Sequence, residues 1–384
     1  MTKLQPSARL IESISAVSPA SWDALANPHG APFNPFVSHA FLFALEQSGS
    51  ATRQSGWQPA HLLLEQPGAL VGAAPMYIKS HSYGEYVFDH GWAQAFERAG
   101  GAYYPKLQIT VPFTPASGPR LLTGGNSQHR QALARAVMAF AQKLVLSSVH
   151  ITFQQQDEAE ALTQLGFLPR HDQQFHWQNA GYRTFDEFLS ALSAIKRKNL
   201  RRERKEALSA GIEIELLTGS DLREAHWDAF FEFYTDTGSR KWGSPYLTRN
   251  FFSLISQSMA DQTLLIMAKR QGRTIAGALN FIGSDTLYGR NWGAIEHHPF
   301  LHFELCYYQA IEFAISKGLK TVEAGAQGEH KLARGYLPVR TYSSHWIAHP
   351  GLRDAVARYL KEERRAVGEA IEELGEHSPF RKPE

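Results

Sequence analysis

The feature that most constrains the fold is a weak internal repeat with an offset of 205 residues. Val71-Gly72-Ala73 recurs as Ala276-Gly277-Ala278, and Tyr83-Gly84 recurs as Tyr288-Gly289. Around both segments an apolar run leads into a polar turn with glycine and then into two further apolar runs. This pattern predicts an antiparallel meander with short turns. Because it occurs twice, we expect the two halves of the chain to share a fold.

Hydrophobic periodicity predicts the elements around each meander. In the second half we expect a strand, two helices, three meander strands, a helix, a strand, a glycine turn with a short helix, and a last strand. The strands and longer helices of this half are expected at 212–217, 221–237, 246–259, 263–269, 274–283, 286–291, 303–316, 321–324 and 341–348. The first half repeats this order loosely, with elements near 22–25, 41–46, 60–88, 131–144, 149–153, 158–165 and 174–178.

This order is that of the GNAT acyltransferase fold. The expected fold class is therefore α/β, with two tandem GNAT-like domains whose mixed, mostly antiparallel sheets are flanked by helices. Residues 1–180 are expected to form the first domain and residues 181–384 the second. The second domain includes a basic helix at 196–206 and a C-terminal charged helix at 352–374.

Composition narrows the function classes. The 384 residues contain 39 Lys and Arg against 37 Asp and Glu, so no global basic field indicates duplex nucleic acid. Cys306 is the single cysteine, which excludes an intrachain disulfide and a multi-cysteine zinc site. We expect a reducing, cytoplasmic location. No apolar run approaches 18 residues, so no membrane span is expected. Nothing here predicts the oligomeric state.

The strongest charge cluster is the run 196–206, with seven basic and two acidic residues. It follows Phe188, Leu189, Leu192 and Ile195, an apolar stripe at helical spacing. One interpretation is a solvated helical face. The other is a surface for phosphates or for a tRNA backbone, since no motif for reading bases is present. The candidate phosphate-binding residues are Lys196, Arg197, Lys198, Arg201, Arg202 and Arg204.

The second constellation is the segment 323–331, Glu-Ala-Gly-Ala-Gln-Gly-Glu-His-Lys, directly after an expected strand. Its glycines permit a tight turn and close approach by a ligand. Glu329 or His330 could act as a base, and Lys331 supplies a cation. The alternative is a plain glycine turn with surface charges. Our candidate catalytic residues are Lys331, Glu329, His330 and His302. Our candidate substrate-binding residues are Gly325, Gln327, Gly328, Glu304, Arg290, Arg334, Lys79, His81 and Lys106.

Other chemical motifs are missing from the sequence. His298 and His302 are four residues apart, but Pro299 argues against one regular helix that presents both. The HExxH zinc motif is absent, and we expect no metal site. There is no GxGxxG segment after a strand, no Walker A motif and no GxSxG elbow. We therefore expect no tightly bound cofactor.

The run 196–211 resembles the basic helix that opens the second domain of Fem-type peptidyltransferases. The segments 56–62, 103–108, 302–309 and 325–331 resemble a bacterial family of N-acyltransferases labelled peptidoglycan biosynthesis or recognition. The resemblance covers nearly the whole chain. It implies a tandem GNAT fold with one active centre in the cleft between domains or in the second domain. Fem-type relatives move an amino acid from aminoacyl-tRNA to an amine of a peptidoglycan precursor, and Lys331 resembles the lysine near the end of their second domain.

The chain departs from ordinary GNAT enzymes at one place. They carry a Q/RxxGxG/A loop, whose amides bind the acyl-CoA pyrophosphate, between the third meander strand and the next helix. Here that place reads Ala-Ile-Glu-His-His-Pro-Phe-Leu (294–301), without glycine, and the first half lacks the pattern too. Acyl-CoA and aminoacyl-tRNA are both candidate co-substrates, and the missing loop favours the latter.

Two function classes remain. One is an acyl- or aminoacyltransferase that forms an amide bond with a small-molecule or peptide amine. The other is a non-catalytic tandem-GNAT module that binds peptidoglycan precursors or a partner protein. Convergent polar groups around residues 325–331 would favour the enzyme, and a closed apolar cleft would favour the binding module.

Overall fold

Contacts divide the chain into two compact units. The computed structural model describes residues 6–241, 245–325 and 328–381. Unit 1 comprises Met1–Asp172 and Arg340–Glu369, and unit 2 comprises Gln173–Val339 and Ala370–Glu384. This division differs from a single cut at residue 180, because the chain returns to unit 1 after completing most of unit 2.

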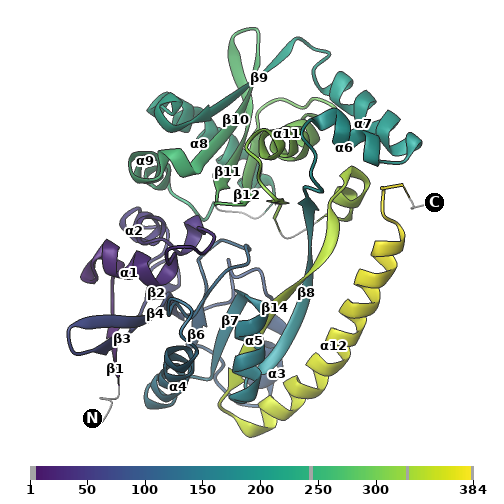
Figure 1. Ribbon diagram of the computed structural model, residues 1–384. Helices are drawn as coiled ribbons and strands as arrows, with labels where there is room; N and C mark the ends of the chain where they lie inside the picture. Colours follow the sequence, from purple (N-terminus) through teal and green to yellow (C-terminus); the bar gives the residue numbers. More distant parts are fainter. Residues whose placement is uncertain (1–5, 242–244, 326–327, 382–384) are drawn as a thin grey trace. The chain divides into compact units, whose positions relative to one another are not determined.

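From residue 212 onward the elements follow the expected order closely, whereas the first half has additional elements at Ser7–Ile11, Trp57–Pro59, His90–Arg98 and Lys106–Ile109 (Figure 1). Those of unit 1 alone are β1 (Ser7–Ile11), α1 (Pro19–Ala26), α2 (His39–Gln47), β2 (Trp57–Pro59), β3 (His61–Gln66), β4 (Ala69–Ala74), β5 (Met76–Lys79), α3 (His90–Arg98), β6 (Lys106–Ile109), α4 (Ser127–Lys143), β7 (Ser148–Gln154) and α5 (Gln156–Gln164). Three elements contribute residues to both units: β8 (Leu168–Gln178), β14 (Leu337–Ile347) and α12 (Pro350–Glu376). Those of unit 2 alone are α6 (Phe185–Ala191), α7 (Ala194–Ala207), β9 (Ile212–Thr218), α8 (Glu224–Lys241), α9 (Arg249–Ser258), β10 (Thr263–Arg270), β11 (Arg273–Ile282), β12 (Thr286–Ala294), α10 (Leu301–Phe303), α11 (Gln309–Ser316) and β13 (Thr321–Glu323).

Unit 1 corrects part of the expected meander. β3 and β4 form the predicted antiparallel hairpin and share a small sheet with β1. The next strand, β5, leaves that sheet and pairs with β2 and β6 instead. Pro75 stands between β4 and β5 and has no N–H to continue a ladder, which accounts for the break. Tyr83-Gly84 therefore lies in a loop, whereas Tyr288-Gly289 lies on β12.

The core of unit 1 forms where α4 packs on the strands. Leu133 and Val137 of α4 are fully buried beside Leu64 of β3 and Ile151 of β7. Gly72 makes this packing close, since a Cβ there would lie 2.7 Å from Cδ1 of Leu133. One member of the sequence repeat thus marks a contact between a helix and a strand.

Unit 2 contains the complete meander. β9, β10, β11 and β12 are successive antiparallel neighbours, and β12 then pairs in parallel with β13. The β12–β13 ladder covers Thr286–Tyr288 of β12 only, although β12 continues to Ala294. The ladder therefore ends at the point where the segment 324–331 begins.

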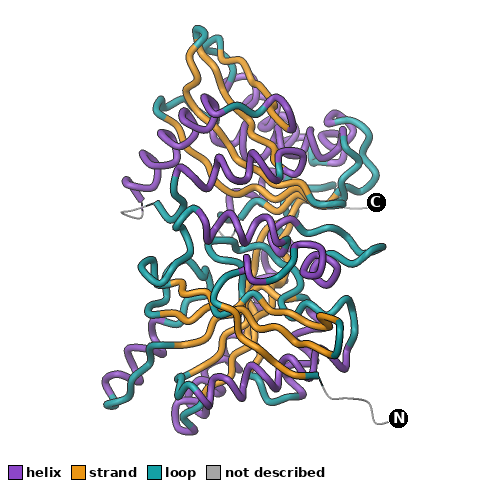
Figure 2. The backbone as a smooth tube through the Cα atoms, turned by 90° about the vertical axis from the view of Figure 1, so that its left-hand side faces the viewer, coloured by secondary structure: helices purple, strands orange, loops and turns teal. Residues whose placement is uncertain are grey.

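Helices cover both faces of this sheet. In Figure 1, α8 and α9 lie on one side of β10 and β11, and α6, α7 and α11 lie on the other. Figure 2 shows the strands of unit 2 running between helices. Two strand glycines allow α8 to approach closely: a Cβ at Gly277 would lie 2.9 Å from the Phe230 ring, and one at Gly293 would lie 2.2 Å from the Phe233 carbonyl oxygen.

The helix expected at 303–316 is not one regular α-helix. It consists of α10, a π-helical turn at Glu304–Tyr308, and α11. The N–H of Gln309 bonds to the carbonyl of Glu304, five residues back, which widens the turn. π-Helical turns of this kind occur often at functional sites. Within the part of the chain that the structure describes, no helix has the length and hydrophobicity needed to cross a bilayer.

Replacing Gly293 with alanine tests the packing of α8 on β12. The added methyl group meets backbone atoms of Phe233, which cannot move as a side chain can. We expect a loss of about 1–3 kcal/mol in the free energy of unfolding, the usual scale of overpacking. Gly375→Ala is the control, because its Cβ meets nothing within 4 Å and lies in α12. Urea denaturation of both variants is the measurement, and equal stability would contradict the close approach.

Candidate functional site

The candidate turn begins where β13 ends. Gly325 has a φ of +77° and Gly328 a φ of +115°, conformations that favour glycine. A 3₁₀ helix at Glu329–Arg334 follows and ends at Gly335. Gln327, one of our predicted substrate-binding residues, lies outside the described residues. The segment thus has the tight glycine geometry that the sequence predicted.

Gly328 also makes room for a candidate base. A Cβ on Gly328 would lie 2.4 Å from Cε1 and 2.9 Å from Nδ1 of His330. The imidazole therefore lies directly over the glycine backbone. Any larger residue at position 328 would displace the ring as well as strain the turn. His330 and its neighbour Glu329 are both exposed.

Lys331 lies inside the turn and is only 2% exposed. Its Nζ donates to the carbonyl oxygen of Gly325 at 2.9 Å and so bridges the turn. Burial lowers the pKa of Lys331 to about 8, and nearby Cys306 opposes this shift. Lys331 acts in turn on His176 of β8, whose pKa falls to about 3, mainly through burial.

Tyr307, which the sequence analysis missed, orients His330. Its hydroxyl and Nε2 of His330 share a hydrogen bond of 2.9 Å. Burial raises the pKa of Tyr307 well above its usual range, so the phenol keeps its proton. Partial burial and the cations Arg334 and Lys331 lower the pKa of His330, which favours the neutral ring. The only sequence signal for Tyr307 was its place in the segment 302–309.

Arg334 stabilises the turn through hydrogen bonds. Its Nη1 donates to the carbonyl of His330 at 2.7 Å, and its Nη2 donates to Oε2 of Glu203 at 2.9 Å. Its guanidinium also lies 3.5 Å from the centre of the Phe303 ring. The hydroxyl of Tyr308 donates to the same oxygen of Glu203. Arg334, predicted to bind substrate, therefore holds several elements around His330 in place.

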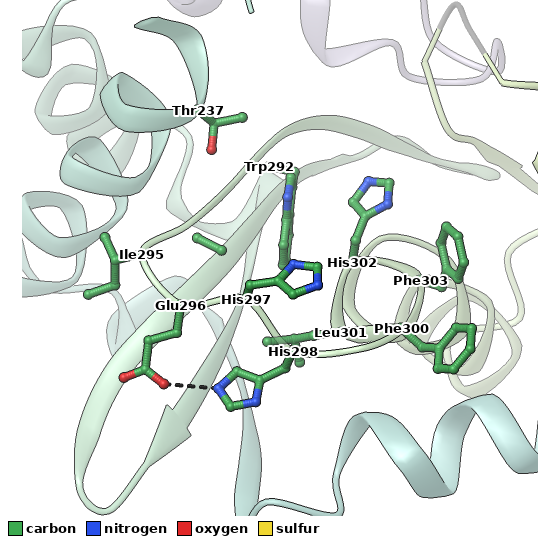
Figure 3. A pocket seen from close by; sticks show the side chains of 11 residues that line it. Thr237, Trp292, Ile295, Glu296, His297, His298, Phe300, Leu301, His302 and Phe303 are labelled. Atoms are coloured by element: carbon green, nitrogen blue, oxygen red, sulfur yellow. Dashed lines mark hydrogen bonds and ion pairs between the residues drawn. The ribbon is translucent and has the colours of Figure 1, made fainter. Parts of the chain in front are cut away.

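A pocket of about 560 Å³ lies beside this cluster (Figure 3). Aromatic, aliphatic and histidine side chains line most of it: Trp292, Ile295, His297, His298, Phe300, Leu301, His302 and Phe303. The loop between β12 and α10 contributes much of this wall. Two wall residues also reach the turn: the ring centres of Phe303 and His302 lie 5.5 and 6.4 Å from that of His330.

One edge of the pocket is a fixed ionic group. Glu296 accepts from Arg270 at 2.9 Å and contacts Nε2 of His298 at 2.9 Å, the contact dashed in Figure 3. The hydrogen bond from Arg270 lowers the pKa of Glu296 to about 2, so its carboxylate stays charged. Among the residues that the structure describes, no group of three or more His, Cys, Asp or Glu side chains could hold a metal ion.

Glu304 is fully buried and belongs to the support of the site. Arg204 of α7 donates to both of its oxygens at 2.8–3.2 Å, and Gln309 donates to Oε1 at 2.7 Å. Arg204 also bonds to Glu312 and lies over the Phe185 ring. The structure thus directs Arg204 inward, apart from the other cations of its helix.

The remaining cations of α7 differ in exposure. Lys198, Arg201 and Arg202 are exposed, whereas Lys196 and Arg197 are half-buried. Arg201 forms an exposed ion pair with Asp186 at 3.3 Å. Leu200 packs in the core, but Ile195, expected to extend the buried stripe, is 74% exposed and corrects that expectation. Ile195 stands near the start of the helix, before its buried edge begins.

The other predicted substrate-binding residues lie in different units of the chain. Arg290 lies half-buried on β12, two residues before Trp292 of the pocket wall. Lys79, His81 and Lys106 lie together in unit 1. His81 accepts from the Tyr83 N–H at Nδ1, so its Nε2 carries the proton and donates to the Ser55 carbonyl. With both ring nitrogens engaged, His81 is a fixed, neutral part of its loop.

Comparison with solved structures shows the fold. The crystal structure of FemX matches with a TM-score of 0.55 at 13% identity and covers 89% of this chain and 98% of that chain. L-PGS from Bacillus licheniformis matches with a TM-score of 0.51 at 10% identity, over 86% and 98% of the two chains. A conserved protein of unknown function from Bacteroides thetaiotaomicron matches with a TM-score of 0.52 at 12% identity, over 89% and 100%. The predicted tandem GNAT-like fold is confirmed.

A family model gives the relationship of the sequence itself. No protein of curated function matches the chain. The FemAB_like model, described as peptidoglycan biosynthesis/recognition, matches residues 13–382 and thus nearly the whole chain. This confirms the family resemblance found in the sequence, and the chain belongs to the FemAB-like family.

Proposed function

We propose that the chain is an N-acyltransferase that moves an aminoacyl group from an ester donor to an amine of a peptide like those of peptidoglycan precursors. The reaction centre in this proposal is the cluster of Tyr307, His330 and Lys331. One observation carries it: His302 and Phe303 line the pocket and also contact the His330 ring. A group held in the pocket would thus lie next to a neutral imidazole.

His330 acts as the base in this mechanism. In the tautomer with the proton on Nε2, the ring donates to the Tyr307 oxygen and Nδ1 is the proton acceptor. The amine nitrogen bonds to the ester carbonyl carbon, and Nδ1 takes the proton that the amine loses. When the ester C–O bond breaks, the same proton passes to the leaving hydroxyl. Tyr307 is a positioning residue, and Glu329 remains a second candidate base.

Lys331 is the candidate for stabilising the oxyanion. It is a buried cation in a turn with irregular backbone, and charge interactions are strong where water is excluded. Its hydrogen bond to Gly325 fixes the position of Nζ before any substrate binds. The resemblance to Fem-type enzymes points to the same lysine.

Two features support an ester donor over acyl-CoA. The place of the pyrophosphate loop has no glycine, and its side chains form an aromatic wall. Arginine and lysine side chains on α7 offer a surface for phosphates, as a nucleic-acid carrier would need. The convergent polar groups near residues 325–331 also favour an enzyme over a non-catalytic binding module.

The test is a transfer assay. The protein is incubated with aminoacyl-tRNA and a UDP-linked muropeptide, and mass spectrometry follows the peptide. We expect the mass of one aminoacyl residue to be added while the tRNA is deacylated. Transfer from acyl-CoA instead would contradict the proposed donor. Thermal shifts with these compounds but no transfer would support the binding module.

Lys331→Met removes the charge and keeps most of the aliphatic chain. We expect turnover to fall by about 10²–10³, the scale for removing one preorganised donor. Lys317→Met is the matched control, because Lys317 is exposed on the same unit. Circular dichroism shows whether both variants fold. Wild-type turnover in Lys331→Met would assign the lysine a purely structural role.

The pH dependence of kcat/KM distinguishes the roles of His330 and Lys331. Neutral His330 is required, so the rate falls as pH drops through the lowered pKa of this imidazole. Protonated Lys331 is required, so the rate also falls as pH rises through about 8. We expect a bell-shaped profile of kcat/KM that loses its alkaline limb in Lys331→Met. Tyr307→Phe should alter the acid limb, whereas Glu329→Gln should leave it unchanged. The reverse result would make Glu329 the base.

Neutralising α7 tests its role with nucleic acid. Replacing Lys198, Arg202 and Lys205 with glutamine leaves the buried edge of the helix intact. If these residues neutralise phosphates, the log–log salt dependence of tRNA binding flattens by about 0.7–0.9 for each phosphate that the variant leaves unneutralised. A Lys317→Gln and Lys320→Gln variant is the control. An unchanged slope in a filter-binding assay would favour a solvated helical face.

A further inference from the structure

Unit 1 contains two lysines that face each other inside its sheet. Lys79 of β5 and Lys106 of β6 are direct partners in the antiparallel register, and their side chains are 0% and 1% exposed. Like charges opposite each other on neighbouring strands are destabilising. A buried ammonium group also loses its hydration. This arrangement therefore calls for anions that lie against both lysines.

Two carboxylates, those of Asp89 and Glu85, lie against the lysines, and they pair with them to different degrees. Asp89 accepts from Lys106 at 2.6 Å and from the Tyr103 hydroxyl at 2.7 Å. Glu85 reaches both lysines, with Oε2 3.2 Å from Nζ of Lys106 and Oε1 3.6 Å from Nζ of Lys79. Oε1 is buried and has no hydrogen-bond partner among the described residues. The contact between Glu85 and Lys79 is thus incomplete.

Lys79 likewise makes fewer hydrogen bonds than its ammonium group can donate. An ammonium group has three donors. In the described part of the chain, Nζ donates one hydrogen bond, to the Tyr83 carbonyl at 3.1 Å, and it lies 3.6 Å from the centre of a Trp57 ring. Burial lowers the pKa of Lys79 and raises that of Glu85. Each charge is therefore only partly compensated by the other.

The lysines and Glu85 also differ in the secondary structure to which they belong. Both lysines lie on paired strands, whereas Glu85 lies in a loop between β5 and α3 without regular structure. Its neighbours Gly84 and Tyr86 have φ values of +82° and +59°. A left-handed conformation is unfavourable for tyrosine, and backbone strain of this kind is often found near functional sites. Strand pairing thus holds the two cations, whereas a loop with unfavourable backbone conformations holds the carboxylate.

The same loop presents aromatic rings to the surface. Tyr83 is 60% exposed and Phe88 is 55% exposed. The ring centre of Tyr83 lies 5.1 Å from that of His81 and 5.5 Å from that of His90. The loop that holds Glu85 thus also presents two large aromatic rings to solvent, where they are available to contact a ligand.

We propose that Lys79 and Lys106 form a binding centre for the carboxylate of a peptide-like ligand, and that Glu85 occupies this centre until the ligand binds. The ligand carboxylate replaces that of Glu85, so the charge of the centre is unchanged. The exposed rings contact the body of the ligand. This site lies in unit 1 and does not depend on the reaction proposed for unit 2.

Chemical rescue tests the lysine pair. Glu85→Ala removes the internal carboxylate and leaves room for another. We expect a lower melting temperature that propionate raises again in a saturable manner, while sodium chloride at equal ionic strength does not. The double variant Glu85→Ala with Lys106→Met should show no rescue. Rescue by inorganic phosphate but not by propionate would contradict a carboxylate site.

Calorimetric titration with N-acetyl-alanine tests the wild-type protein. We expect saturable binding that becomes about tenfold tighter in Glu85→Gln, because the internal competitor has lost its charge, and that disappears in Lys79→Met. Glu158→Gln is the matched control, since Glu158 is a buried carboxylate of the same unit that accepts from backbone amides. If Lys79→Met does not fold, the comparison of the affinities of Glu85→Gln and the wild type still tests the proposal. Absence of binding to both would show a structural ion pair and overturn the proposal.

Discussion

The early end of the β12–β13 ladder governs the candidate site of unit 2. The ladder ends after three residue pairs, because β13 ends there. β12 then continues toward the pocket wall, while the chain after β13 bends through Gly325 and Gly328. The sheet therefore carries part of the pocket wall at the end of β12, and the turn with Lys331 and His330 after β13. The π-helical turn completes this arrangement by placing Tyr307 against His330.

Much of the architecture could be predicted from the sequence, because the relevant signals are local. The strands of unit 2, the turn after β13, and helices α7 and α12 all follow from periodicity and from glycine positions. The repeat at Gly72 and Gly277 proved to mark two places where a helix packs closely on a strand. The likeness at Tyr83-Gly84 was misleading, because Pro75 ends the first-half meander before that point.

The parts that could not be predicted depend on contacts distant in sequence. Tyr307 meets His330 across 23 residues, and Arg334 meets Glu203 across 131. No spacing rule connects such residues. The inward direction of Arg204 likewise depends on Glu304, which is 100 residues away. In unit 1, the facing of Lys79 and Lys106 depends on the register of two short strands, one of which, β6, the periodicity did not reveal.

The discontinuous composition of unit 1 has a consequence for biosynthesis. In unit 1, strand β7 lies between β6 and β14. Leu352 and Val356 of α12 pack in one of the hydrophobic clusters of this unit. A nascent chain therefore lacks an interior strand of unit 1 until residues 337–347 have left the ribosome. Unit 2 has most of its sequence available earlier. Domains usually fold in the order of synthesis, N-terminal first. Here residues 340–369, which follow most of unit 2 in the chain, complete unit 1, so their deletion would also damage the fold of residues 1–172.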